Sequence, residues 1–311
     1  MLASWNPEQP EITDLIVRHD PRTLQREPVR KQEVVEIFQR FGNWQAIRAV
    51  QELPEWDGML VDAAVDRAML AIHWEMQRLS EEFYHGKRVW EILQAAVVTL
   101  RKSGFLNKIR IVDVGCGAGY TLRWLAANIS AREQGLEFAG VDLNSTLIRE
   151  AARLAEAERL DCTFSHGDAF SPQLAGNIVI STGVIHHFRG AELEEFLWRH
   201  EREETRMFFH FDFQPSLLAP VGSWFFHQLR MRTAIARHDG VLSAARAHTA
   251  KTLVEAARIG APGFASGMYG ARIWNTPLPR VFHTLVGLRR PLVEEFRLQL
   301  GRRAGRLGEL R

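Results

Sequence analysis

A glycine-rich loop between an apolar run and a helical stretch is the first place where this sequence could do chemistry. Gly115, Gly117 and Gly119 allow positive φ angles and leave no side chain between the backbone and a ligand. A ligand can therefore lie against the loop and the start of the following helix. The dinucleotide fingerprint Gly-x-Gly-x-x-Gly fails, because its last position is Tyr120. The spacing favours a different nucleoside ligand.

Two acidic residues follow later apolar runs. Asp142 comes directly after Glu137–Val141, and Asp168 follows Cys162–Ser165. A carboxylate can accept two hydrogen bonds from a ribose diol, and open α/β sheets bind ligands beyond the carboxyl ends of their strands. The alternative is a capping role: Asp142 would cap the helix that starts near the predicted N-cap Ser145, and Asp168 would cap a turn.

Adjacent histidines follow the run Ile178–Thr182. His186 and His187 have side chains suited to taking a proton near neutral pH. The alternative is a buried histidine satisfied by a backbone carbonyl. No metal site is expected, because the two rings point differently and no carboxylate stands at ligand spacing. The weaker candidates for the acceptor site are His210, Asp212, His227 and His238.

These motifs, in this order over Ile109–Phe188, resemble the class I S-adenosylmethionine (SAM)-dependent methyltransferases. The resemblance implies SAM as cofactor and S-adenosylhomocysteine as product. It implies ribose binding by Asp142 and adenine binding by Asp168. It also places the methyl group beside the loop that follows Ile178–Thr182. The residues expected to bind the cofactor are Asp113, Gly115, Cys116, Gly117, Gly119, Asp142, Leu143, Asp168, Ala169 and Thr182.

The function implied is methyl transfer to a small, partly apolar acceptor, with His186 or His187 lining the acceptor site. The segment Ala236–Arg246 resembles small-molecule methyltransferases related to the quinone-biosynthesis type. Two alternatives remain open: a methyltransferase acting on RNA or protein, and a non-catalytic SAM-binding relative. The acceptor atom is not determined, since O-, N- and C-methylation share this core.

Strands that alternate with helices predict an α/β fold with a doubly wound parallel sheet. The resemblance makes it a Rossmann-like, seven-stranded methyltransferase sheet. We expect a helical N-terminal cap over residues 1–104, a core over 105–275 with a lid insertion at about 214–247, and a basic, helical tail over 276–311. Phe264–Tyr269 and Arg272–Trp274 are expected to end the sheet as an antiparallel pair.

Composition and charge narrow the function classes. The 311 residues are 46% apolar and 24% charged, which is ordinary for a globular protein. The net charge of +2 gives no case for DNA as a partner. Positive charge gathers in the Arg-rich tail, which we interpret as a solvated face or a homodimer contact, with an anionic membrane surface or RNA as alternatives.

Cysteine content and hydropathy indicate the compartment. Cys116 and Cys162 cannot build a disulfide framework, which suits a reducing environment. We found no signal peptide and no apolar run of the roughly 18 residues that a membrane span needs. The expected location is therefore cytoplasmic.

Overall fold

The computed structural model describes residues 8–170, 175–215, 219–270 and 282–310. The chain forms two compact units. We call Met1–Leu79 with Pro215–Ala247 the helical unit, and Ser80–Gln214 with His248–Arg311 the sheet unit. The sequence predicts a different division, into residues 1–104, 105–275 and 276–311. That division stays a prediction about where the methyltransferase core begins and ends.

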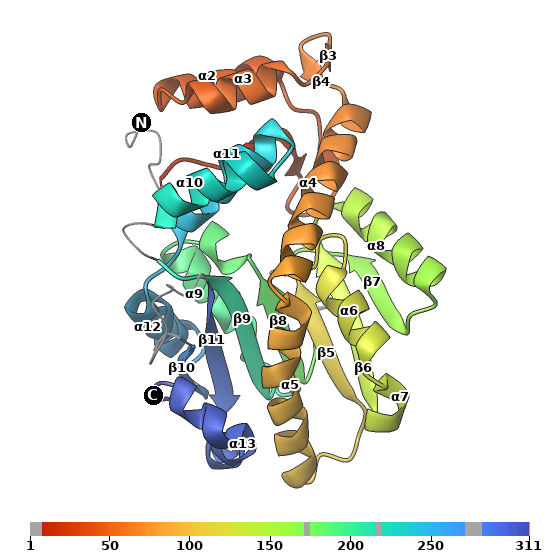
Figure 1. Cartoon of the computed structure of the whole chain (residues 1–311), viewed down its shortest axis with the longest axis vertical. Coiled ribbons are helices and arrows are strands. Elements are labelled where there is room, and N and C mark those ends of the chain that lie inside the picture. The colour runs from red at the N-terminus through yellow and green to blue at the C-terminus, as the bar shows by residue number, and fades with distance from the viewer. Residues whose placement is uncertain (1–7, 171–174, 216–218, 271–281, 311) are drawn as a thin grey trace. The chain divides into compact units, whose positions relative to one another are not determined.

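The sheet unit is built on a seven-stranded sheet with the order β10-β11-β9-β8-β5-β6-β7 (Figure 1). Strands β5 to β9 pair in parallel, whereas β11 runs antiparallel between β9 and β10. This is the predicted Rossmann-like methyltransferase sheet. The strands are β5 (Ile109–Val114), β6 (Leu136–Asp142), β7 (Cys162–His166), β8 (Ile178–Thr182), β9 (Met207–Phe213), β10 (Phe264–Tyr269) and β11 (Phe282–Arg289).

Three central strands begin and end where their apolar runs do. The runs Ile109–Val114, Ile178–Thr182 and Met207–Phe213, which the sequence predicts as strands, have the same bounds as β5, β8 and β9. Nearly every residue of these strands is buried, because helices cover both faces of the sheet. A strand buried on both faces has no polar face, so a short continuous apolar run identifies it.

The predicted helical tail is wrong at its start. Residues Phe282–Arg289 form β11, which completes the sheet, and helix α13 begins only at Val293. The expected strand Arg272–Trp274 lies outside the described residues. Strand β11 is decided by its pairing with both β9 and β10.

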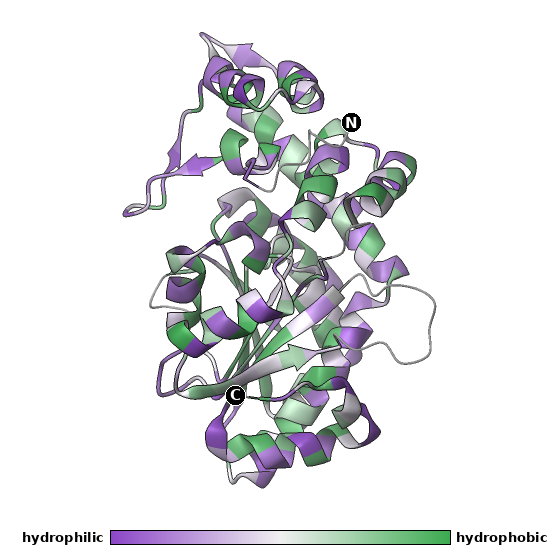
Figure 2. Cartoon of the chain, turned by 90° about the vertical axis from the view of Figure 1, so that its left-hand side faces the viewer, coloured by the Kyte–Doolittle hydropathy of each residue, from purple (hydrophilic) through white to green (hydrophobic). Residues whose placement is uncertain are grey.

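Helices bury apolar faces against both sides of the sheet. The cluster on one side includes residues of α5 (His85–Lys102), α6 (Tyr120–Asn128) and α13 (Val293–Leu300). The cluster on the other side includes α9 (Ala191–Trp198) and α12 (Ala250–Gly260). Green and purple residues alternate along the helices (Figure 2), as in amphipathic helices with one buried face. Two further helices, α7 (Ala131–Gln134) and α8 (Ser145–Glu158), flank β6.

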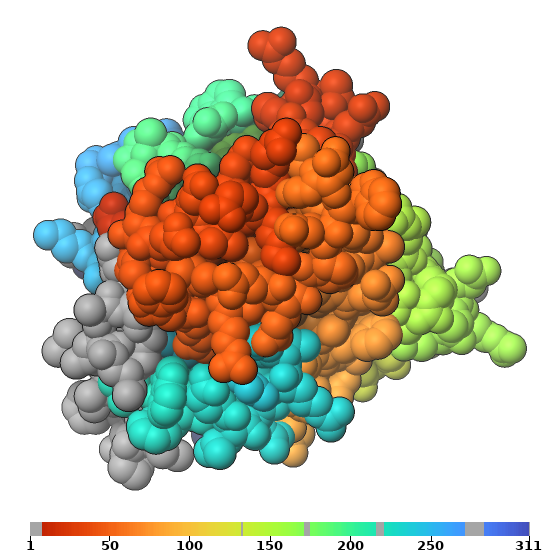
Figure 3. All heavy atoms as spheres, turned by 90° about the horizontal axis from the view of Figure 1, so that it is seen from above, coloured from red at the N-terminus to blue at the C-terminus, as the bar shows by residue number. Residues whose placement is uncertain are grey.

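The helical unit combines the N-terminal helices with the insertion that follows β9. Figure 3 shows the insertion, in cyan, beside the orange N-terminal segment. Its helices are α1 (Ile12–Ile16), α2 (Lys31–Arg40), α3 (Trp44–Gln51), most of α4 (Asp62–Glu82), α10 (Ala219–Arg230) and α11 (Ala234–Arg246). Two short hairpins pair β1 (Arg18–His19) with β2 (Arg26–Glu27), and β3 (Glu55–Trp56) with β4 (Met59–Leu60). Most of the described N-terminal segment is helical, and Met59 and Leu60, which lie in a stretch with apolar residues at helical spacing, form strand β4.

Polar side chains of α11 hold the start of the chain. The Asp239 carboxylate accepts hydrogen bonds from the backbone N–H groups of Ile12, at 2.9 Å, and Thr13, at 3.0 Å. Ser243 donates to the Glu11 carboxylate at 2.8 Å. The segment Ala236–Arg246, singled out by its resemblance, therefore anchors the N-terminal segment.

Candidate active site

The glycine loop lies between β5 and α6 and follows a tightly constrained path. Gly115, Gly117 and Gly119 all have positive φ. A Cβ atom added at Gly115 would come within 2.6 Å of Val184, and one at Gly119 within 2.5 Å of Phe164. The loop thus needs glycine both for its backbone conformation and for space.

Asp142 ties the loop to the end of β6. One of its carboxylate oxygens accepts the N–H of Gly117 at 2.8 Å, and the other accepts the N–H of Asn144 at 2.8 Å. The N-cap of α8 is Asn144 and not the predicted Ser145, because the Asn144 side chain accepts N–H bonds from Thr146 and Leu147. Asp142 does not cap α8. Its carboxylate has further lone pairs with which to accept bonds from a diol.

Asp168 and its neighbours lie beyond the end of β7. The Asp168 carboxylate accepts the N–H of Phe170 at 3.1 Å, which is the capping contact considered as its alternative role. Leu143 is 38% exposed, and Ala169 is half-buried. Leu143 and Asp168 follow neighbouring parallel strands, so both lie at the carboxyl edge of the sheet.

Asp113 is the most perturbed carboxyl group beside the loop. It is 2% exposed, and its Oδ1 has no hydrogen-bond partner among the described residues. Burial, together with the negative charge of Asp142, raises the pKa of Asp113 to about 8. An orphaned carboxyl oxygen beside a side-chain-free loop fits a ligand that brings a hydrogen-bond donor or a positive charge.

Cys116 is not a reactive thiol. Burial, with the charges of Asp142 and Asp113, raises the pKa of the thiol well above its ordinary value, so the nucleophilic thiolate is suppressed. Its backbone N–H, the group expected to matter, bonds the carbonyl of Val141 at 3.1 Å. Cys116 therefore fixes the loop against β6.

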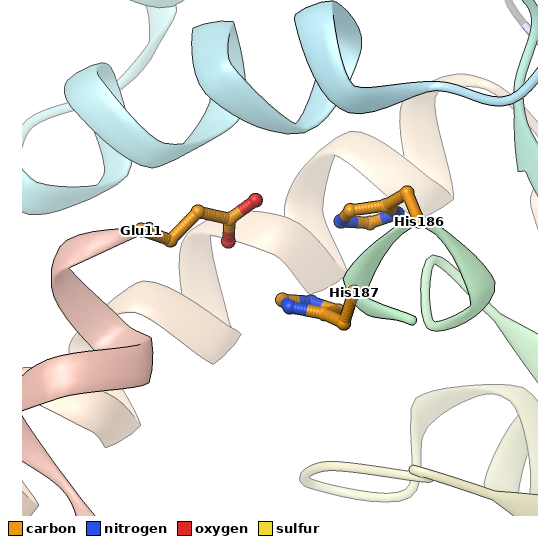
Figure 4. Close-up of side chains that lie close together, drawn as sticks. All are labelled: Glu11, His186 and His187. Carbon is orange, nitrogen blue, oxygen red and sulfur yellow. The ribbon is translucent and has the colours of Figure 1, made fainter. Parts of the chain in front are cut away.

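The predicted His186 forms a buried pair with Asp212, at the end of β9. His186 lies on the short 3-10 helix η2 (Ile185–His187). Its Nδ1 is 2.8 Å from one Asp212 oxygen, and its backbone N–H donates to the other at 3.0 Å. Both side chains are 3% exposed. The neighbouring ring of His187 lies at a centroid distance of 4.4 Å, with the two ring planes tilted by 32° (Figure 4).

The pair is supported by two histidines that the sequence did not single out. His248 lies 3.2 Å and 2.9 Å, through Nε2, from the carbonyl oxygens of Ile185 and Phe188, so it donates to the η2 turn. His283 faces Asp212 across the β9–β11 register, and burial lowers its pKa to about 4. Neither has a local motif. Only the chain path brings them to η2 and Asp212.

Thr182 ends β8 as predicted and lies near His85. The His85 Nε2 is 3.3 Å from the Thr182 hydroxyl. Burial, with a smaller contribution from Arg88, lowers the pKa of His85 to about 4, which keeps this imidazole neutral.

The other histidine candidates are placed elsewhere. His210, on β9, is fully buried, and its ring nitrogens lie 2.9 Å from the Ser181 hydroxyl and 2.9 Å from His200 Nε2. His227 and His238 belong to the helical unit. Of the two weaker candidates in the sheet unit, Asp212 contacts His186, whereas the ring of His210 contacts Ser181 and His200.

Residues 111–202 match the family model described as "Methyltransferase domain". That span contains the glycine loop, Asp142, Asp168 and His186. This part of the chain is a methyltransferase domain. The glycine loop with the orphaned Asp113 oxygen fits a cationic nucleoside such as SAM.

Solved structures of methyltransferases are similar to this chain at low identity. Magnesium protoporphyrin IX methyltransferase from Synechocystis, with S-adenosylhomocysteine, is 19% identical, covers 83% of this chain and 99% of its own, and has a TM-score of 0.41. Human N-acetylserotonin methyltransferase, with SAM, is 13% identical, covers 84% and 71%, and has a TM-score of 0.48. A plantazolicin methyltransferase is 11% identical, covers 74% and 99%, and has a TM-score of 0.46. These values are too low to transfer an acceptor.

Within the described ranges, no helix combines the length and the apolarity that crossing a bilayer requires.

Proposed function

We propose that this methyltransferase acts on a small, partly apolar acceptor whose nucleophilic atom gives up a proton to His186. The supporting observation is the buried His186–Asp212 pair at the carboxyl edge of the sheet. Because the acidic Asp212 accepts the Nδ1–H bond, it favours the tautomer whose Nε2 carries the lone pair. His186 is then oriented to take a proton through Nε2.

The cofactor residues follow from the same edge of the sheet. Asp142 would accept the ribose hydroxyls, Asp168 would face the adenine, and Leu143 and Ala169 would form apolar walls. Asp113 and the glycine loop would hold the remainder of the cofactor, and Thr182 would contact it from the end of β8. Bound SAM supplies a methyl group on an already activated sulfonium. The chain therefore has to orient the acceptor, exclude water and remove a proton.

The acceptor class is tested by methyl transfer from labelled SAM to a panel of small phenols and aromatic carboxylic acids, with tRNA and unstructured peptides as competing classes. Transfer to a small hydroxyl or carboxyl compound is expected. Transfer to tRNA or peptide alone would contradict the proposed acceptor, and SAM binding with no transfer to any class would favour the non-catalytic reading.

The cofactor assignment is tested by Asp142→Ala. Calorimetry with SAM should show at least about tenfold weaker binding, because the ribose hydroxyls lose a charged acceptor and the Gly117 N–H loses its partner. Glu156→Ala, an exposed carboxylate on α8 in the same unit, is the matched control and should leave the affinity unchanged. Equal affinity in both variants would remove Asp142 from the site.

A further inference from the structure

An arginine-lined cavity of about 490 Å³ lies within the helical unit. None of its seven lining residues is acidic, and four are arginines: Arg78, Arg230, Arg232 and Arg237. We call it the arginine cavity. They come from the later part of α4, the last residue of α10, the following turn and the first part of α11. The α10–α11 pair lies beside α4 in Figure 1.

Two of these guanidinium groups are held in place by backbone carbonyls at the end of α10. Arg78 donates to the carbonyl of Arg230. Arg237 donates through Nε to Met231, at 2.8 Å, and through a terminal nitrogen to Arg232, at 3.2 Å. Helix C-termini attract cations, which explains why arginines gather here. These contacts use only part of the five donors that each guanidinium carries, and they fix its position.

The lining of the cavity is positively charged, since four of its residues are arginines and none is acidic. Arg78, Arg232 and Arg237 form no ion pair within the described part of the chain, and the buried Nε of Arg78 has no hydrogen-bond partner there. Elsewhere in the unit, Arg246 pairs with Asp14 at 2.8 Å. The nearby Glu75 carboxylate is engaged with the backbone N–H groups of Arg232 and Thr233.

We propose that the arginine cavity binds a small multivalent anion through phosphate or carboxylate groups. Guanidinium groups match both anions with paired N–H donors, and two of them are already positioned, so little side-chain freedom is lost on binding. A bound anion would also relieve the repulsion between like charges around one cavity. The cavity is formed by residues of the helical unit alone, and the proposal does not depend on the acceptor proposed above.

Isothermal calorimetry on the full chain tests the proposal with two probes, pyrophosphate and citrate. Binding that weakens as salt rises is expected for at least one of them, and the preferred probe identifies phosphate or carboxylate as the ligand group. Arg232→Gln and Arg78→Gln should each weaken binding about tenfold or more. Arg48→Gln, an exposed arginine on α3 of the same unit, should leave binding unchanged.

The choice of variants separates binding from folding. Arg78 also holds a backbone carbonyl, so its loss could unfold the unit, which a circular-dichroism melt would reveal. The described hydrogen bonds of Arg232 are made by its backbone, so Arg232→Gln keeps them. No heat with either probe at millimolar concentration would overturn the proposal, as would an equal loss of affinity in Arg48→Gln. SAM affinity, measured alongside, should not change in any variant.

Discussion

At the scale of single residues, one carboxylate controls the orientation of the proposed base. Asp212 accepts both the backbone N–H and the ring Nδ1–H of His186, so the ring and its peptide are fixed together. Burial raises the pKa of Asp212, but the interaction with His186 and backbone hydrogen bonds outweigh burial, and the net shift is downward. Asp212 therefore stays ionised, which stabilises the imidazolium after proton transfer.

Asp212→Asn should lower methyl transfer to the best acceptor by about 10² to 10⁴-fold, the usual contribution of a positioned acid–base group. SAM affinity should stay within about twofold, since the cofactor residues are untouched. Single-turnover assays and calorimetry measure the two effects. Nitrogen NMR of His186 adds a readout that loss of packing would not mimic, because the Nδ1–H tautomer should lose its dominance. An unchanged transfer rate would remove the pair from catalysis.

Asp113 makes stability depend on pH. Its folded pKa of about 8 lies above the ordinary value of 3.8, so the folded state holds the proton more tightly than the unfolded chain does. This contribution to stability is complete below about pH 4 and is lost as the pH rises to about 8.

The variant Asp113→Asn should therefore flatten the pH dependence of unfolding between pH 4 and pH 8, where one fully shifted group contributes a slope of up to about 1.4 kcal/mol per pH unit. Urea unfolding of both proteins across that range measures it. Parallel curves for the wild type and the variant would show that Asp113 does not titrate abnormally.

At the scale of elements, a glycine sets how closely α10 and α11 approach. A Cβ at Gly240 would overlap the imidazole of His227, and Ser223 donates to the Gly240 carbonyl at 2.9 Å. Gly240 lies inside α11, and glycine is intrinsically unfavourable inside a helix. The packing contact explains why glycine is needed at position 240.

Gly240→Ala should destabilise the protein by about 1–3 kcal/mol, because the added methyl group overpacks the helix contact. The control is Gly222→Ala on α10, where no atom lies within 4 Å of the added Cβ, and where alanine should stabilise by about 0.5–1 kcal/mol. Thermal melts give both values. Adding His227→Ala to Gly240→Ala should recover part of the loss, and strict additivity of the two changes would contradict the proposed contact.

At the scale of the whole molecule, each unit is assembled from segments that are far apart in the chain. The helical unit joins residues before position 80 to residues 215–247. Asp239 links them, since it accepts N–H bonds at the start of α1 and pairs with His238, whose other ring nitrogen lies 2.7 Å from the Asn43 side chain. This carboxylate joins three elements of one unit.

Asp239→Ala should release the N-terminal segment, because the start of α1 loses its acceptor. Hydrogen exchange read by mass spectrometry should show faster exchange in peptides covering Glu11–Ile16 and little change in peptides covering β5. Glu36→Ala, an exposed carboxylate on α2, serves as control and should alter neither. Unchanged exchange in the N-terminal peptides would show that the anchor lies elsewhere.

Much of the sheet and the conformation of the glycine loop were predictable from local sequence. Strands β5, β8 and β9 have the predicted bounds, since each is a short apolar run that must be buried. Glycines in a strand–loop–helix context likewise limit the ligand to one that approaches the backbone closely. The positive φ angles at Gly115, Gly117 and Gly119 confirm the reason for that composition.

Other features depend on contacts between distant residues, and only the tertiary structure decided them. Asp212 and His186 are 26 positions apart, and His283 reaches Asp212 only because β11 inserts between β9 and β10. Strand β11 itself was predicted as part of a helical tail, because its pairing partners are not visible in its own residues. Local patterns record which face of a segment is buried, whereas long-range pairing and the chemistry of buried pairs are set by the path of the whole chain.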